Sequence, residues 1–550
     1  MPKEPERSLE SHAGPDDRLP EASRRRVFLI VAVTVLFAET GVLQFTMVSP
    51  AVLRIAPSFP GVGADISWVN TVFALTGAVA APLLGKASDL WGKKRMMTVS
   101  GVLFVIGSLV TALTASWPAF LAGRVLQGLS LGIGAVAYGL FRDILPRRYV
   151  PTAIGMLTTG SGAGVIAAPL LSGYLLDHYS WRSLFWVMTL YGIATLVLLV
   201  LLVPESNHRF RQHLDLLGAF VLAAGLALLL VYLSNGHNWG WSALGSLAYL
   251  AGGLVLLGLF VPVERRAPSP LIDLHLLGDR RVLGTLAVTF WGSVAVSVWA
   301  YAVPLMTQTP TAAQLTAGAR AQAVASGLPS ATAALLHVSF SGSLAFAGGL
   351  SLIGCAVHQM VWQGGTALFA GPAAGWLAGR RSMRFPLLLG FAAFASAAVL
   401  MLALLTHGIW FFALTGAVFG LGFGAYYAIT PTLMMEAAPP RLQGISAGMF
   451  SLAANIGQSI ATATVTAVIW ADPLVMKVTL GPKSLGQVNL TAQYSLMTLR
   501  TAQILMWIVL GATVVACTCT LVLRHARAAA TGGAASEEQR APEQAGVVAA

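Results

Sequence analysis

The sequence predicts an all-α polytopic membrane protein with fourteen membrane-spanning helices. Of its 550 residues, 56% are hydrophobic and only 10% are charged, and the mean hydropathy is +0.75. Apolar runs of about 20 residues, the length that crosses the hydrocarbon core as a helix, recur along most of the chain. These runs do not alternate every second residue, which excludes a membrane β-barrel. A soluble chain of this length would carry far more polar surface.

Both ends of the chain are predicted to be disordered tails. Residues 1–26 mix acids, bases and prolines, and the apolar run that follows is longer than the core of a secretory signal. We therefore expect this run to remain as the first span. Residues 524–550 are rich in alanine, glycine and glutamate, a composition that does not form a packed core.

The fourteen predicted spans are an even number, so both tails lie on one side of the membrane. If that side is the cytoplasm, the inner connections hold seventeen lysines and arginines and the outer connections hold six. Basic residues gather in cytoplasmic loops, which sets this orientation and explains the net charge of +12 without a nucleic-acid partner. The expected location is the plasma or inner cell membrane. The predicted spans are 27–49, 66–84, 96–116, 118–141, 151–175, 183–203, 214–233, 243–263, 282–304, 353–377, 385–406, 408–431, 443–470 and 501–523.

One region allows two interpretations. Residues 337–379 are nearly all apolar or small and are too long for one span. Two spans would leave an odd total and would place the basic stretch GRRSMR outside, so one span preceded by an outer segment is preferred. The outer connections 305–352 and 471–500 are longer than their first-half counterparts and are candidates for an outer vestibule.

An internal repeat indicates how the spans are grouped. Pro82 and Gly85 align with Pro372 and Gly375 at an offset of 290 residues, and the same offset relates further glycines of the fourth and twelfth spans. Equivalent spans then run in parallel orientation, which predicts two six-helix halves with two helices inserted between them. The predicted divisions are an N-terminal bundle at 27–203, a two-helix linker with its loops at 204–281 and a C-terminal bundle at 282–523.

Three motifs resemble signatures of the major facilitator superfamily. The loop GKASDLWGKKR resembles the superfamily pattern G-x-x-x-D-(R/K)-x-G-R-(R/K), with Leu90 in place of the usual base. The resemblance implies a latch on the cytoplasmic side that must break for inward opening, and glycines there permit tight turns. A topology-setting basic loop would explain the lysines alone. The matching residues, which we expect to form the cytoplasmic gate, are Gly85, Asp89, Gly92, Lys93 and Lys94.

The other two motifs lie inside predicted spans. GRVLQG resembles the R-x-x-Q-G motif of the fourth span, through Arg124, Gln127 and Gly128. GMLTTGSGAGVIAAPLLSG resembles the antiporter motif of the fifth span, G-x8-G-x3-G-P-x2-G-G, although Ala168 and Ser172 replace two glycines. This motif and the fourteen spans resemble the drug:proton antiporter branch of the superfamily over about residues 27–523. The matching residues of the antiporter motif are Gly155, Gly164, Pro169 and Gly173.

Glu39 is the only clear acidic residue inside the predicted spans. It lies about 18 Å along the first helix from Val27, near the centre of the bilayer. Burial disfavours a charged carboxylate and a nearby arginine favours it, so we expect Glu39 and Arg124 to form a proton-coupling pair. The alternative is an uncharged Glu39 that hydrogen-bonds a neighbouring helix.

Amide and aromatic side chains on the remaining spans are candidates for the substrate cavity. Gln359 and Gln363 share one helix face, as do Asn455 and Gln458, because each pair is about one turn apart. Interhelical hydrogen bonding would explain the same residues. With the fourth-span glutamine and one tyrosine of that span added, the predicted cavity set is Gln127, Tyr138, Gln359, Gln363, Asn455 and Gln458.

These observations predict a proton-coupled exporter of hydrophobic or amphiphilic small molecules that works by alternating access. A lone intramembrane acid disfavours a dicationic substrate and favours a neutral, zwitterionic or monocationic one. The alternative is a major facilitator importer or uniporter. An enzyme is not expected, since the sequence has no glycine-rich phosphate loop and no nucleophile elbow. The three cysteines lack metal-ligand spacing. The expected partners are an amphiphile, protons and the lipid bilayer, acting on a monomer without metal or cofactor.

Overall fold

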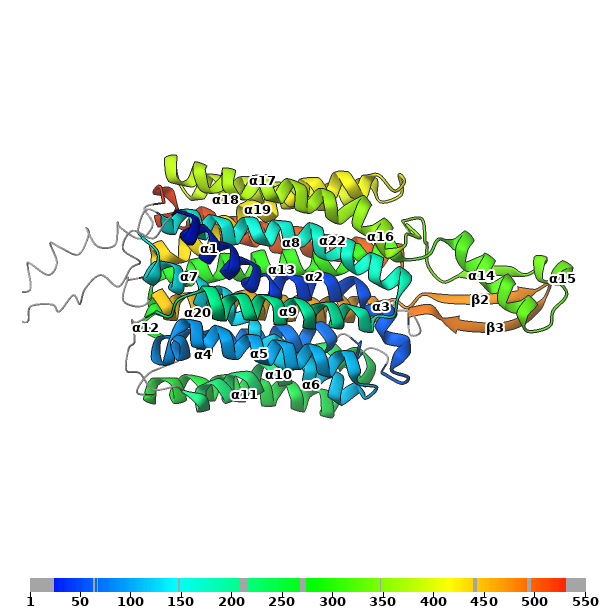
Figure 1. The fold of residues 1–550 in the computed structure, drawn as a ribbon. Helices are drawn as coiled ribbons and strands as arrows, with labels where there is room; N and C mark the ends of the chain where they lie inside the picture. The colour runs from blue at the N-terminus through cyan, green and yellow to red at the C-terminus, as the bar shows by residue number, and fades with distance from the viewer. Residues whose placement is uncertain are drawn as a thin grey trace, which may run out of the picture.

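The computed structural model describes residues 24–530, except 63–64, 67, 147–148, 207–214, 268–273, 347, 439–442 and 492–495. Long helices run side by side in one bundle, and a small sheet with short helices projects from one end (Figure 1). We call this end the sheet end. The opposite end, where α1 begins and η8 lies, is called the terminal end.

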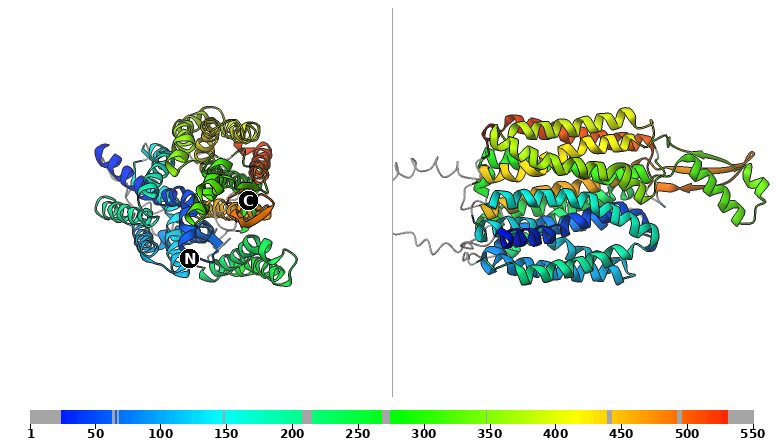
Figure 2. Two further views of the ribbon diagram at one scale, coloured as in Figure 1. Left: turned by 90° about the vertical axis from the view of Figure 1, so that its right-hand side faces the viewer. Right: turned by 45° about the horizontal axis from the view of Figure 1, so that its top comes forward.

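The first half of the bundle runs from α1 to α9 and occupies the blue to cyan part of Figure 2. Its helices are strongly apolar, and several expose leucine, valine and tryptophan side chains on the outside of the bundle, as expected for helices that face lipid. The elements are α1 (Arg24–Ala38), α2 (Thr40–Val48), η1 (Ser49–Ala51), α3 (Val52–Ile55), η2 (Ala56–Ser58), α4 (Trp68–Trp91), α5 (Lys93–Leu113), α6 (Trp117–Gly128), η4 (Leu129–Gly132), α7 (Ile133–Ile144), α8 (Val150–His178) and α9 (Arg182–Leu202).

Two helices, α10 (Leu216–Trp239) and α11 (Leu244–Arg266), follow the first half and pack against each other at the side of the bundle (Figure 2). The carboxylate of Asp215 caps α10 by accepting a hydrogen bond from the Gly218 amide at 2.7 Å. Through α10 the pair contacts α4 and α20, one helix from each half.

The second half runs from α13 to α22. Helices that correspond under the repeat have matching lengths: α5 and α18 each have 21 residues, and α8 and α20 each have 29. The elements from here on are α12 (Leu274–Gly278), α13 (Arg280–Gln308), α14 (Ala312–Ala325), α15 (Ser330–Ala334), β1 (His337–Phe340), α16 (Leu352–Cys355), the π-helical turn η6 (Ala356–Met360), α17 (Val361–Arg380), α18 (Arg384–Leu404), α19 (Phe411–Ala437), α20 (Gln443–Ala471), β2 (Val475–Leu480), β3 (Lys483–Asn489), α22 (Leu499–Val522) and η8 (His525–Arg527).

By length and composition, 11 helical segments among the described residues can cross a membrane, or up to 12 if the bent helix α4 is one span. The predicted arrangement of fourteen spans is therefore supported only in part. The helices α8 and α17 coincide with predicted spans but are not among these segments. The region 337–379 contains one continuous helical run, α16–η6–α17, preceded by a strand, in agreement with the preferred interpretation.

Two predicted spans remain continuous across a local irregularity. Glu39 joins α1 to α2 with helical dihedral angles, and Leu43 N donates to Glu39 O at 2.9 Å, whereas the fourth span contains the 3-10 segment η4. The predicted disordered tail is also wrong at its start. Residues 524–530 pack against the terminal end of the second half, where Ala528 O accepts a hydrogen bond from Met383 N at 3.0 Å and Ala530 N donates one to Ala378 O at 3.0 Å. The rest of both predicted tails, 1–23 and 531–550, lies outside the described residues.

A three-stranded antiparallel sheet in the order β1-β2-β3 forms from the two long outer connections. The strand β1 comes from the connection between α13 and α16, and the hairpin β2–β3 comes from the connection between α20 and α22. The hairpin turns at Gly481, whose φ of +57° suits glycine. The sheet therefore ties two connections of the second half together outside the bundle.

The strand register can be tested by cross-linking. Val338 faces Val478 across β1 and β2, and directly opposed residues of an antiparallel pair lie about 4.5–5.5 Å apart, within disulfide range. Oxidation of a Val338→Cys/Val478→Cys protein should therefore form an intramolecular disulfide, detectable by mass spectrometry. The diagonal control, Val338→Cys/Met476→Cys, should cross-link far less. Equal cross-linking of both pairs would contradict the register.

Candidate functional site

A cavity of about 250 Å³ lies between the two halves. Four of the six predicted cavity residues line it: Gln359 and Gln363 from η6 and α17, and Asn455 and Gln458 from α20. Among the described residues, the lining contains no Asp, Glu, Lys or Arg. The cavity can therefore hold an uncharged molecule without desolvating an unpaired protein charge. Its aromatic lining residues are Phe45, Phe73, Phe423, Tyr427 and Phe450.

The two glutamines of the second half are hydrogen-bonded to each other. Gln359 Nε2 donates to Gln363 Oε1 at 2.6 Å, and Trp299 Nε1 donates to the same oxygen at 3.3 Å. Both glutamines are buried: 2% of the surface of Gln359 and 6% of the surface of Gln363 are exposed. The pair thus forms a fixed polar patch on a mostly apolar wall.

Glu39 is buried inside the first half, with 6% of the residue exposed, and does not face lipid. Three residues before it, on α1, Leu36 O accepts a hydrogen bond from Tyr191 Oη of α9 at 2.5 Å. The α8 backbone approaches closely, because a Cβ atom added at Gly160 would lie 3.0 Å from Glu39 Oε1. Glu39 is not in the cavity lining, whereas Gly41, two residues further, is.

The guanidinium group of Arg124 is fully buried and is bound by neutral oxygens. Its Nε donates to Val69 O at 2.9 Å, and Nη1 donates to the amide oxygens of Gln44 at 2.9 Å and Gln127 at 2.7 Å. The ring of Phe73 lies 4.5 Å from the guanidinium carbon, which adds a cation–π contact. Among the described residues no ion pair joins Arg124 to Glu39, so the predicted counter-charge of Arg124 is wrong for this conformation.

Gln127 and Tyr138 lie outside the described lining of the cavity. Gln127 instead orients Arg124, and its Nε2 donates to Ser108 Oγ at 2.9 Å. Tyr138 lies on α7 and packs against the core cluster of the first half that includes Val35 and Phe37. Gln44, which the sequence analysis did not single out, completes the Arg124 network. The sequence does mark Gln44, because it is an amide five residues after Glu39 in an otherwise apolar run.

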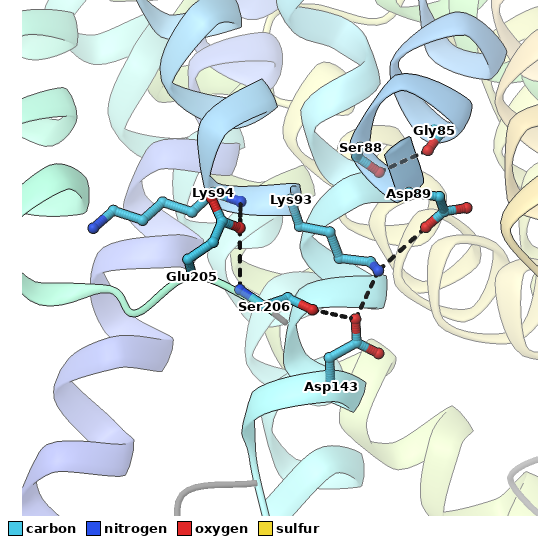
Figure 3. Close-up of polar contacts among 8 residues, drawn as sticks. All are labelled: Gly85, Ser88, Asp89, Lys93, Lys94, Asp143, Glu205 and Ser206. Atoms are coloured by element: carbon cyan, nitrogen blue, oxygen red, sulfur yellow. Dashed lines mark hydrogen bonds and ion pairs between the residues drawn. The ribbon is translucent and has the colours of Figure 1, made fainter. Parts of the chain in front are cut away.

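The signature loop at the terminal end contains a buried ion-pair cluster (Figure 3). Lys93 Nζ lies 3.2 Å from Asp89 Oδ1 and 2.6 Å from Asp143 Oδ2, and Ser206 Oγ donates to the same Asp143 oxygen at 2.8 Å. The side chains of Lys93 and Asp143 are only 7% and 8% exposed. Lys93 therefore supplies a positive charge next to Asp89, where the signature pattern would have a basic residue at position 90. Through its two carboxylate partners, Lys93 links α4, α5 and α7.

A third carboxylate, that of Glu205, caps α5 beside this cluster (Figure 3). Glu205 accepts hydrogen bonds from the backbone amides of Lys94 and Arg95, both at 2.9 Å, at the positive end of the helix dipole. Gly92 precedes the helix with a φ of +103°, and a Cβ atom there would lie 2.8 Å from the Glu205 carboxyl carbon. The signature glycine is thus required by both backbone conformation and space. Lys94 Nζ donates to Val200 O at 2.8 Å, and Gly85 O accepts from Ser88 Oγ at 2.7 Å.

The antiporter motif lies on α8, between the two halves. Pro169 lines the cavity, and Gly164 is buried. Gly173 allows α8 to touch the second half, because a Cβ atom there would lie 2.8 Å from Ile353 N on α16. Gly155 lies in the first turns of α8, in a stretch whose side-chain surroundings are outside the described set.

Side chains that could together bind a metal ion were not found in the described part of the chain. No group of three or more His, Cys, Asp or Glu residues is arranged there to hold an ion.

Comparison with known proteins identifies the class. Residues 29–462 match the family described as Major Facilitator Superfamily, and this chain therefore belongs to that superfamily of membrane transporters. Among solved structures, the POT family transporter PepTSo superimposes with a TM-score of 0.59, covering 92% of this chain and 99% of that one at 14% identity, which supports the fold alone.

Two relatives are named for drug export. The tetracenomycin C resistance and export protein of Streptomyces glaucescens is 27% identical over 79% of this chain and 74% of its own length. The multidrug resistance protein Stp of Mycobacterium tuberculosis is 28% identical over 78% of this chain and 73% of its own length. Four other curated transporters are 28% to 33% identical to this chain over the matched region. That region covers only 37% to 56% of the length of each of these relatives. The relatives favour the drug-efflux branch.

The ion-pair cluster predicts a specific loss of stability. Lys93→Met leaves two carboxylates at the terminal end without their cation, and breaking a buried pair costs about 3 kcal/mol. The midpoint of thermal unfolding of the purified protein should fall clearly. A matched Arg95→Met variant should unfold near the wild-type temperature, because only the backbone amide of Arg95 takes part. An unchanged midpoint for Lys93→Met would contradict the cluster's stabilising role.

The backbone of the signature loop yields a second expectation. Gly92→Ala forces a residue with a Cβ into the left-handed region and against Glu205, a strain of about 1–3 kcal/mol. Its unfolding midpoint should fall below that of Gly379→Ala, the matched substitution near the end of α17, where nothing lies within 4 Å. Equal midpoints for the two variants would contradict the close fit.

Proposed function

We propose that this chain is a proton-coupled antiporter that exports hydrophobic or amphiphilic small molecules from the cytoplasm by alternating access. The observation that carries the proposal is the burial of Glu39 inside the first half, beside a cavity that both halves line. Acidic residues buried in membrane bundles generally serve proton or substrate pathways. The names of the two drug-export relatives support the substrate class.

In this proposal, proton and substrate use neighbouring sites in the interior. Glu39 takes a proton from the outer side while the substrate leaves, and releases it to the cytoplasm after the halves have moved. Arg124 lies in a separate network through Gln44, five residues along the same span. Inward proton movement supplies about 2.3 kcal/mol per 100 mV.

The terminal end would lie in the cytoplasm, as the distribution of lysine and arginine favours. All members of the Lys93 cluster come from the first half or its end, so the cluster stabilises the cytoplasmic end of that half. The Gly173 contact between α8 and α16 joins the two halves, and alternating access requires contacts of this kind to break. A chain that lacked proton coupling would be an importer or uniporter, which the following experiment distinguishes.

The test uses everted membrane vesicles that contain the full-length chain and the uncharged fluorescent amphiphile Nile red. Wild-type protein should accumulate the dye against its gradient and release protons from the vesicle lumen when dye is added. Glu39→Gln should abolish both, because an amide does not exchange a proton in this range, while dye exchange without a gradient persists. Asp177→Asn, an acid near the sheet end paired with Arg54 at 3.8 Å, is the matched control and should transport normally.

Two results would count against the proposal. Undiminished uphill transport by Glu39→Gln would remove Glu39 from the mechanism. Dye transport by the wild type without proton movement would identify a uniporter instead.

A further inference from the structure

The direction of the hydrogen bonds in the Gln359–Gln363 pair is set by Trp299. An indole N–H only donates, so the Gln363 atom that faces Trp299 must be the amide oxygen, Oε1. The Gln359 atom that meets the same oxygen must then be the amino group, Nε2. It follows that the free ends of the two amides are of opposite kind: Gln359 presents its oxygen and Gln363 its amino group.

These free ends have no protein partner in the described part of the chain. Gln359 Oε1 is buried without a hydrogen bond. No hydrogen bond donated by Gln363 Nε2 is found among the described residues either. A buried acceptor without a partner is costly, and native proteins keep such groups mainly where a ligand or water meets them. Both residues line the cavity, which is where such a partner can enter.

The pair is held rigidly. Trp299 is fully buried and stacks on Phe419 at 4.3 Å between ring centroids, and Phe419 stacks on Phe394 at 4.4 Å. Thr366 Oγ1 donates to Ala417 O at 2.8 Å and fixes α17 against α19. Gln359 itself lies in the π-helical turn η6, an element found frequently at functional sites. The two free ends are therefore preorganised and need little reordering on binding.

The rest of the cavity lining determines what kind of ligand body can lie beside the two glutamine amides. Its described lining carries no formal charge, and aromatic rings from both halves contribute to it, including Phe45 and Phe450. Rings of this kind pack favourably against a flat apolar body. A charged ligand would have to give up its hydration without an opposite charge to meet it.

On the basis of the proposed function, we propose that this cavity selects uncharged, planar ligands that carry a hydrogen-bond donor beside an acceptor, as in an aryl carboxamide. The ligand N–H or O–H donates to Gln359 Oε1, and its neighbouring carbonyl accepts from Gln363 Nε2. The first half and α20 cover the apolar body. Specificity then comes from the second half, and proton coupling from Glu39 in the first.

The test measures binding to the purified full-length protein in lipid nanodiscs by calorimetry. The probes are 2-naphthamide, which has both groups, and N,N-dimethyl-2-naphthamide, which lacks the donor. Losing one hydrogen bond and leaving the Gln359 oxygen unmet should weaken binding about fivefold to tenfold. This comparison uses wild-type protein and does not depend on the folding of any variant.

Variants assign the effect to the two amides. Gln359→Leu should abolish the preference for 2-naphthamide over its dimethyl derivative, because the acceptor is gone. Gln363→Leu should weaken binding of both probes, since both keep the carbonyl. The matched control is Gln503→Leu on α22, an exposed glutamine outside the cavity lining, which should keep the wild-type ratio between the probes. A ratio near one for wild-type protein, an unaltered ratio in Gln359→Leu, or no binding of either probe would overturn the proposal.

The outcome is separable from that of the proposed function. Binding in nanodiscs needs no proton gradient, so a preserved probe ratio together with failed proton-coupled export would count against the export mechanism alone. Equal probe affinities with intact export would count against the ligand class alone.

Discussion

The burial of a permanent cation among neutral oxygens organises the interior of the first half. A guanidinium group in a membrane bundle is tolerated only when nearly every N–H finds an acceptor. Arg124 on α6 meets this requirement in part: its Nε and Nη1 donate to oxygens from α2 and α4 and to its own neighbour Gln127, whereas Nη2 has no hydrogen-bond partner among the described residues. Gln127 is in turn held by Ser108 of α5. Four helices are thus joined around one side chain. Gln44 and Glu39 lie on the same span, so a rearrangement of this network would also shift the backbone that carries the Glu39 carboxyl group.

Much of the fold could be predicted because the length of an apolar run is a local signal. The predicted span 443–470, for example, coincides with α20 at Gln443–Ala471. The 3-10 segment at Leu129–Gly132 could not be predicted, since the flanking residues are as apolar as in a regular α-helix. The sheet was also missed. β1 has four residues, too few for a readable alternation, and its partner strand lies more than a hundred residues away.

The candidate site was predicted unevenly for a similar reason. The signature loop was identified with all its matching residues, because their spacing lies within one stretch of chain. Asp143 and Glu205, which complete the ion-pair cluster and cap α5, come from the ends of other helices and carry no motif of their own. The amides on η6, α17 and α20 were singled out as polar residues in apolar spans. Their hydrogen-bond polarity depends on Trp299, sixty-four positions from Gln363, and only the folded chain brings these side chains together.

The projecting sheet has a mechanical consequence. All three of its strands arise from connections that begin and end on helices of the second half, so no strand pairing ties it to the first half. The sheet is thus attached to the second half alone. A small rotation of that half about an axis in the membrane would displace the tip of the β2–β3 hairpin more than the base of the sheet, because the tip lies farther from the bundle (Figure 1). A fluorophore placed on that tip would thus report the conformational state of the whole protein from a position that neither substrate nor proton needs to visit.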